Sequence, residues 1–147
     1  MKRLVLALAI VGASLSVSAD ASPSHAQAKK KASGDLSTIV TNAVSGGSAA
    51  GMIIELYEIS GAKPRKITQV STGEDGRADL ISSGPLPLGK YELRFQVGDY
   101  FRKQSVGASD PALLDFVPVR FSITDPAGHY HVPLTCTPSS YTTYRGS

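Results

Sequence analysis

Cysteine is almost absent from this chain of 147 residues, since Cys136 is the only one. An intrachain disulfide is therefore excluded, and stability must come from packing and assembly. Histidine is nearly as scarce, with only His25, His129 and His131. Because structural zinc sites draw on several cysteine and histidine ligands, we expect no metal site.

Long apolar runs are lacking as well, because no stretch reaches the roughly eighteen residues that indicate a membrane-spanning helix. We therefore expect no membrane span. The longest apolar stretch, from about Leu4 to Val17, follows basic residues and precedes small ones that suit a signal peptidase. This pattern predicts a signal peptide over residues 1–21 and a periplasmic or secreted location. A buried helix is the alternative, but the polar tract that follows offers nothing to pack against it.

A linker over residues 22–34 is rich in Ala, Ser and Lys, a composition that buries too little apolar surface to offset the entropy of ordering. The net positive charge of the chain comes from residues 1–31, which include three lysines of this linker. Of the fifteen Lys and Arg residues, five precede residue 32, and so does one of the twelve acids, which leaves ten basic and eleven acidic residues in the rest. We therefore expect the folded part to bind no nucleic acid.

The remaining region, residues 35–147, alternates polar and apolar residues with the period of two that is typical of half-buried strands. The alternation is clearest over residues 91–97 and 117–123, and residues 52–59 are more uniformly apolar, which predicts deeper burial. Turn residues separate the runs at the spacing typical of an antiparallel sandwich or barrel. A short helix is expected near residues 99–105. Shorter strands are expected at residues 36–42, 66–71, 130–136 and 141–144.

A ligand-binding arginine is the first candidate functional feature of this β-rich region. Arg77 follows Gly76 and opens a candidate strand, where its planar guanidinium would meet an anionic or carbonyl-rich ligand. An arginine at the start of a strand is also often simply solvated, so position alone leaves both interpretations open.

Two histidines form the second candidate feature. His129 and His131 lie two residues apart in a run whose alternate positions are apolar, so both imidazoles leave from one face. An imidazole titrates near neutral pH and passes protons, which suits hydrolysis of a ring amide, although an exposed pair that binds nothing is the alternative. Pro133 on the same face lacks a backbone donor and favours an edge strand or a subunit seam.

Several segments resemble bacterial transthyretin-like 5-hydroxyisourate hydrolases. The resemblance covers about residues 36–147. It includes AAG at 49–51, DGR at 75–77, GDYF at 98–101, VPVRF at 117–121, HYHVPL at 129–134 and YRGS at 144–147. The HYHVPL and YRGS segments are together highly specific for this family.

The resemblance implies an all-β, transthyretin-like (prealbumin-like) domain over residues 35–147, an antiparallel Greek-key sandwich of two four-stranded sheets with one short helix. It also implies a homotetramer whose clefts lie between dimers. The implied reaction is hydrolysis of 5-hydroxyisourate to 2-oxo-4-hydroxy-4-carboxy-5-ureidoimidazoline in urate catabolism, without a metal or an organic cofactor.

Residue roles carry over by position from the same resemblance. His131 is implied to be the catalytic histidine, and Arg77 to hold the developing negative charge or the ring carbonyls. Ser147 is implied to be a catalytic residue at the end of the chain. Tyr144 and His129 are implied to contact or support the substrate.

Ile39 departs from the family pattern, because the family's opening motif has a histidine after a run such as LST at residues 36–38. Isoleucine cannot take a proton, so it would line the substrate site only, and the loss of one positioned acid or base costs about a hundredfold to ten-thousandfold in rate. This favours an alternative function, a non-catalytic transthyretin-like periplasmic binding protein. An accessory or adhesion-type sandwich would have no reason to end in YRGS.

Overall fold

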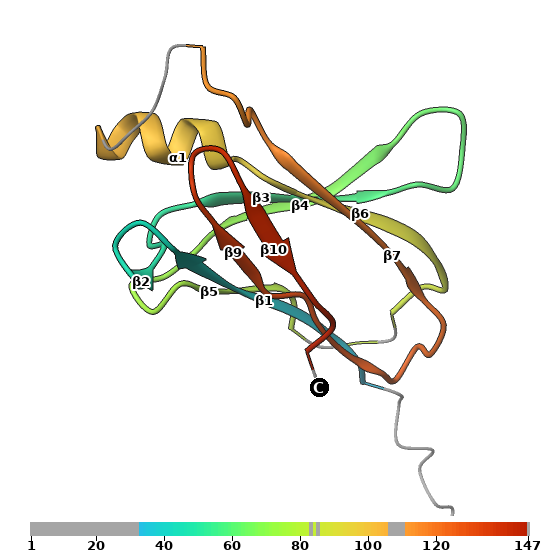
Figure 1. The fold of residues 1–147 in the computed structure, drawn as a ribbon. Helices are drawn as coiled ribbons and strands as arrows, with labels where there is room; N and C mark the ends of the chain where they lie inside the picture. The colour runs from blue at the N-terminus through green and yellow to red at the C-terminus, as the bar shows by residue number, and fades with distance from the viewer. Residues whose placement is uncertain (1–32, 83, 85, 106–110, 147) are drawn as a thin grey trace, which may run out of the picture.

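The computed structural model describes residues 33–146 except 83, 85 and 106–110. Two β-sheets pack face to face, with one helix at an end of the sandwich (Figure 1). One sheet has four antiparallel strands in the order β4-β3-β6-β7. Their bounds are Arg65–Ser71 for β4, Ile53–Glu58 for β3, Gly89–Phe95 for β6 and Val117–Ile123 for β7.

The second sheet is built around β1 (Asp35–Asn42). On one side of β1 lie β5 (Arg77–Ile81) and the two-residue β2 (Gly47–Ser48), both antiparallel to it. On the other side lie β8 (His129–His131) and β9 (Leu134–Cys136), followed by β10 (Tyr141–Thr143). This sheet thus has six strands, not the predicted four, because β8 and β9 follow one another along one side of β1 and β5 and β2 follow one another along the other. The predicted sandwich of two sheets with one short helix is confirmed.

A further expectation about this sheet was wrong. The sheet is not wholly antiparallel, because β8 and β9 both run parallel to β1. Of the two interpretations of Pro133, the edge strand is excluded, since the interrupted strand lies between β1 and β10, and the subunit seam stays a prediction. The missing donor is tolerated because Pro133 falls in the break between β8 and β9, and its carbonyl accepts a hydrogen bond of 2.7 Å from Thr143 Oγ1.

The predicted short helix is present as α1 (Val97–Gln104), and it begins two residues earlier than expected. Val97, which continues the alternation of β6 in sequence, is therefore helical. Tyr100 and Phe101 are buried and fix the helix against the sandwich. The helix ends at Ser105, which adopts a left-handed conformation with φ 54°. Within the described part of the chain, no helix is long and apolar enough to cross a membrane.

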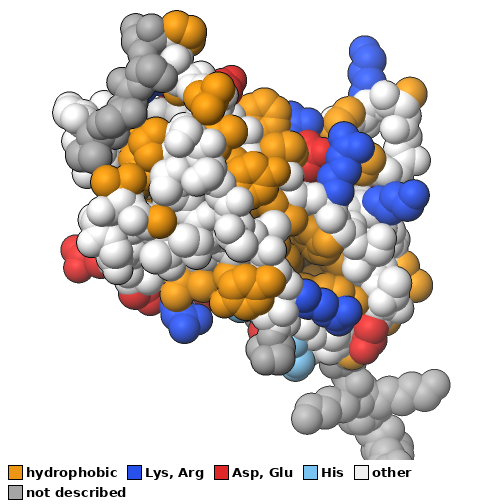
Figure 2. Space-filling view, in the orientation of Figure 1, with side chains coloured by type: hydrophobic (Ala, Val, Ile, Leu, Met, Phe, Trp, Pro, Cys, Tyr) orange, Lys and Arg blue, Asp and Glu red, His pale blue; other side chains and the backbone are white. Residues whose placement is uncertain are grey.

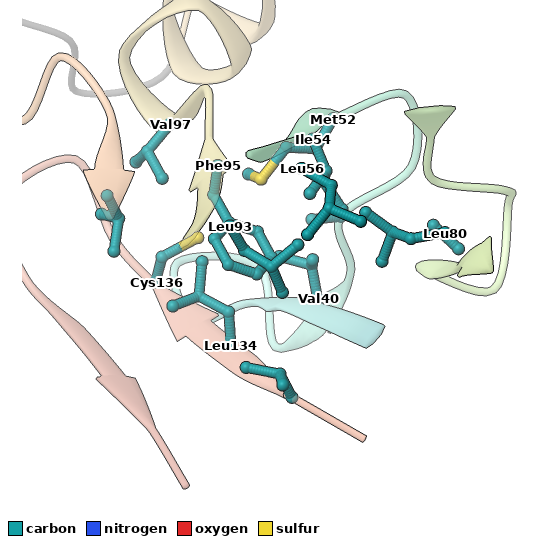
Figure 3. Packing of buried hydrophobic residues seen from close by; sticks show 14 of the residues in the cluster. Val40, Met52, Ile54, Leu56, Leu80, Leu93, Phe95, Val97, Leu134 and Cys136 are labelled. Carbon is teal, nitrogen blue, oxygen red and sulfur yellow. The ribbon is translucent and has the colours of Figure 1, made fainter. Parts of the chain in front are cut away.

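The core lies between the two sheets, where alternate residues of β1, β3, β5, β6 and β9 point inward (Figure 3). From β1, Leu36 and Val40 are completely buried. They pack with apolar residues of the opposite sheet and of β9, including Ile54, Leu56, Leu93, Phe95, Leu134 and Cys136. Burial raises the pKa of the Cys136 thiol to about 11, so this cysteine is an inert core residue. The packing fixes which residues of β1 face outward.

Glu92 is an exception to the alternation of β6. The sequence pattern puts it on the polar side of the strand, yet its side chain is only 2% exposed. Arg94 Nε and Arg120 Nε donate to its two carboxylate oxygens at 2.6 and 2.5 Å. Burial alone would raise the pKa of Glu92, but these two hydrogen bonds outweigh it and lower the pKa below the ordinary value.

Candidate active site

The outward face of β1 organises the predicted site. Ser37 and Ile39 alternate with the buried Leu36, Thr38 and Val40, so they point away from the core. On one side, Ile39 is the cross-strand partner of Arg77 in β5. On the other side, Ser37 is the partner of His131 in β8. Two residues of β1 thus connect the predicted arginine with the predicted histidine.

A tight turn fixes the start of β5, and with it the position of Arg77. Gly76 has φ +76°, and a Cβ at this residue would lie 2.5 Å from the Val40 carbonyl oxygen. The Gly76 carbonyl in turn accepts a hydrogen bond of 2.8 Å from the Val40 amide. Only glycine allows this close approach, which sets Arg77 directly beside Ile39. Asp75 completes the turn, because its Oδ1 accepts from the Arg77 amide at 3.0 Å.

The guanidinium of Arg77 is available to a ligand. Its side chain is 64% exposed, and its Nε lies 3.9 Å from Oδ2 of Asp75, whose side chain is 66% exposed. An ion pair this open to solvent contributes little to stability, and another anion can easily take the place of Asp75. Arg77 is therefore held by its backbone while its charged head remains free to bind.

His129 and His131 project from the same side of β8, as their spacing predicts, and each contacts a residue of β1. Nδ1 of His131 lies 3.0 Å from Ser37 Oγ. Nδ1 of His129 lies 2.8 Å from Oδ1 of Asp35, in a pair that is largely exposed. His131 is the more enclosed of the two histidines, which suits the inner position in the site.

The C-terminal tail lies beside His131. The Gly146 amide donates to the His131 carbonyl at 3.0 Å, and the two residues form an antiparallel bridge. This bridge brings Gly146 beside β8, which pairs with the first residues of β1. Ser147 itself lies outside the described residues, so its predicted role stays a prediction, but its neighbour is in direct contact with the histidine.

Two cavities meet at His131. The first is an open cleft of about 350 Å³, lined by Asp35, Ser37, Arg77, His129, Tyr130 and His131. Its size is in the range that small-molecule ligands occupy. The second, of about 370 Å³, lies between β7 and the tail, and its lining includes Val119, Phe121 and Tyr144. In Figure 2, hydrophobic side chains are visible in a hollow of this face.

The predicted site residues therefore divide into groups. Arg77, His129 and His131 share the first cleft, and Ile39 lies at its edge beside Arg77. Tyr144 is 65% exposed and lines the second cavity, which His131 also borders, but not the first cleft. Within residues 33–146, the described part contains no group of three His, Cys, Asp or Glu side chains that could hold a metal ion.

Sequence reasoning missed Ser37 and Asp35 as residues of the site. Ser37 contributed only to a motif, and nothing in its own surroundings marks it as a partner of a histidine 94 residues away. The contact arises from the parallel pairing of β1 with β8. Period-two alternation gave the correct side of each strand, but it carries no information on which strands are neighbours.

Comparison with known proteins gives matches across the folded part of the chain. A family model described as "HIUase/Transthyretin family" matches residues 36–146. A 5-hydroxyisourate hydrolase of Deinococcus radiodurans is 48% identical over 114 residues, covering 76% of this chain and 95% of the relative. Among solved structures, Klebsiella pneumoniae 5-hydroxyisourate hydrolase has a TM-score of 0.65 at 27% identity, covering 77% of this chain and 99% of its own. An (S)-allantoin synthase has a TM-score of 0.73 at 35% identity, covering 80% of this chain, which spans 45% of that longer one.

Proposed function

The chain belongs to the HIUase/transthyretin family, and on that premise we propose that it is an enzyme that hydrolyses 5-hydroxyisourate. One observation carries the proposal beyond the similarity. Arg77 and His131, which come from strands far apart in sequence, line one open cleft on either side of β1. A cation and a proton acceptor around one small space are what hydrolysis of a ring amide requires.

The proposed chemistry needs water and these side chains. His131 accepts a proton from a water molecule, whose oxygen attacks a ring carbonyl carbon of the substrate. Arg77 stabilises the negative charge that develops on the carbonyl oxygen. The C–N bond of the six-membered ring then breaks, the nitrogen takes up the proton that His131 received, and the product is the carboxylic acid 2-oxo-4-hydroxy-4-carboxy-5-ureidoimidazoline, which keeps its five-membered ring. No metal or organic cofactor is part of this scheme.

The other predicted residues have supporting roles in the proposal. Ile39 provides an apolar wall beside Arg77, and His129, paired with Asp35, borders the cleft on the opposite side. Tyr144 and Ser147 complete the site from the tail, which the contact between Gly146 and His131 brings next to the catalytic histidine.

We also propose a homotetramer and export. Support for assembly comes from β7 and β10, each an outer strand of its sheet, and from the half-buried Val119 and Phe121 of β7, which line the cavity between β7 and the tail. Unpaired strand edges beside apolar surface favour association. Export rests on residues 1–21. Light scattering of the purified protein tests the tetramer, and N-terminal sequencing of the protein from the periplasm tests cleavage after Ala19 or Ala21.

The test of the proposed function is the ultraviolet decay of freshly generated 5-hydroxyisourate. Purified protein should accelerate this decay, and Arg77→Met should reduce the acceleration strongly without unfolding the exposed start of β5. A decay no faster than in buffer would refute the proposal that the protein is an enzyme.

One observation, Ile39 at the position beside Arg77, favours the second candidate, a binding protein that retains the cleft without turnover. Saturable binding of 5-hydroxyisourate or a stable purine analogue, together with decay at the buffer rate, would establish that function instead.

A further inference from the structure

His131 has a single hydrogen-bonding side-chain partner in the described part of the chain, the Ser37 hydroxyl at 3.0 Å from Nδ1. The contact is partly buried, and it joins neighbouring residues of the β1–β8 ladder. Both residues are therefore held by backbone hydrogen bonds as well as by their own contact. A hydrogen bond of this kind at one ring nitrogen fixes which of the two nitrogens carries the proton.

Charged side chains lie near the pair of Ser37 and His131, but none of those described takes the place of Ser37 as the hydrogen-bond partner of His131. Asp35 is engaged by His129, and Asp79 is the cross-strand neighbour of Ser37 on β5. Arg77 precedes Asp79 by two residues and lies on the same face of β5. None of the carboxylates in the described part forms a hydrogen bond to His131, so the group that orients its ring is a neutral hydroxyl.

The C-terminal tail restrains the same ring from another side. A Cβ at Gly146 would lie 2.6 Å from Cδ2 of His131 and 3.1 Å from its Cβ. Gly146 is thus in close contact with the imidazole, and its amide holds the His131 carbonyl. Ser37 and Gly146 together leave the ring little freedom to rotate.

We propose that Ser37 is the positioning residue of His131, an inference that rests on the proposed hydrolase function. The Ser37 hydroxyl accepts the Nδ1–H of the imidazole, so that Nε2 carries the lone pair that takes the proton of water. When His131 becomes an imidazolium, the same hydroxyl still accepts from Nδ1–H. A hydroxyl can play this part because it offers lone pairs as well as a proton. Ser37 itself forms no bond to the substrate.

The kinetic test compares three variants in the 5-hydroxyisourate decay assay. Ser37→Ala removes the hydroxyl, and we expect kcat to fall about tenfold with KM within about twofold of the wild type, as for the loss of one orienting hydrogen bond. Ser37→Thr keeps the hydroxyl and should recover most of kcat. Thr41→Ala, on the same face of β1 but remote from His131, is the matched control and should keep the wild-type rate.

Nuclear magnetic resonance of the imidazole nitrogens tests the inference without turnover. In the wild type, long-range proton–nitrogen spectra should show His131 with Nδ1 protonated, and Ser37→Ala should show a mixture of tautomers. His129→Gln assigns the signals. The spectra still test the role of Ser37 if the wild type does not hydrolyse 5-hydroxyisourate. Such inactivity would refute the proposed function but not the contact that orients His131.

Three outcomes would overturn the inference. One is equal impairment by Ser37→Ala and Ser37→Thr, which would show that packing and not the hydroxyl matters. Another is an identical tautomer mixture in the wild type and Ser37→Ala. The third is a covalent adduct on Ser37 after rapid quenching, because the hydroxyl would then be a nucleophile.

Discussion

Replacing Ile39 by histidine should convert the outer face of β1 into a site with two proton-transfer groups. Ile39 points outward and is the cross-strand partner of Arg77, and it lies two residues along β1 from Ser37, the partner of His131. Cβ atoms of directly opposed residues lie about 5 Å apart, and diagonal neighbours about 7 Å apart. An imidazole at residue 39 would thus reach both Arg77 and a water molecule bound to His131.

The expected gain follows from what one positioned acid or base contributes. That contribution is about a hundredfold to ten-thousandfold in rate, which corresponds to about 2.7 to 5.4 kcal/mol of transition-state stabilisation. The neighbouring Arg77 disfavours a second positive charge, so the new imidazole should stay neutral near neutral pH and be able to accept a proton. The folding cost is small because Ile39 is only half-buried.

The assay is the initial rate of 5-hydroxyisourate decay, measured for the wild type, Ile39→His and Ile39→Gln. Glutamine is polar and similar in length but cannot take a proton, so it controls for the loss of the apolar side chain. We expect a gain of at least about a hundredfold in kcat/KM for histidine alone. An unchanged rate in a folded Ile39→His protein, or an equal change in both variants, would refute the reasoning that proton transfer at this position limits the reaction.

Three further predictions test the site and its scaffold. His131→Ala should lower kcat/KM by at least about a hundredfold, and a wild-type rate would show that the base is elsewhere. Gly76→Ala should lower the free energy of unfolding by about 2 kcal/mol or more, because φ is +76° and Val40 blocks a Cβ; denaturant unfolding measures this, and an unchanged midpoint would contradict it. Glu92→Gln should cost about 1 to 2 kcal/mol at neutral pH, allowing for solvent screening at the exposed Arg120. Because folding lowers the pKa of Glu92, its carboxylate stabilises the folded state at pH values above the ordinary pKa of 4.5, and this stabilisation is lost as the pH falls through the folded-state pKa. The difference in the free energy of unfolding between Glu92→Gln and the wild type should therefore shrink in acid.

The strands and the single helix could be predicted from the sequence because one side of each strand is apolar and must face a core. The alternation over residues 117–123 matches β7 to the residue, and residues 36–42 match β1 to within one. The same reasoning failed at Glu92, since alternation does not reveal that two arginines cover a carboxylate. The edge strand that Pro133 suggested is absent too, because the break between β8 and β9 removes the need for a backbone donor there.

The candidate site could be predicted only in part, for a related physical reason. Arg77 and His131 are identifiable from local chemistry, whereas their proximity depends on long-range pairing with β1. Without the parallel pairing of β1 and β8, no rule connects Ser37 to a histidine near the other end of the chain. The family resemblance supplied the grouping that strand periodicity could not.

The core beneath the site determines where its side chains lie. Ser37 faces the cleft, and Ile39 points outward beside Arg77, only because Leu36 and Val40, each completely buried, set the register of β1. A slip by one residue would turn both outward side chains into the core and separate Arg77 from His131. The energy that packs the apolar side of β1 therefore also orders the polar side. Substitutions at Leu36 or Val40 that leave the protein folded should still lower kcat, since they loosen the strand on which both halves of the site depend.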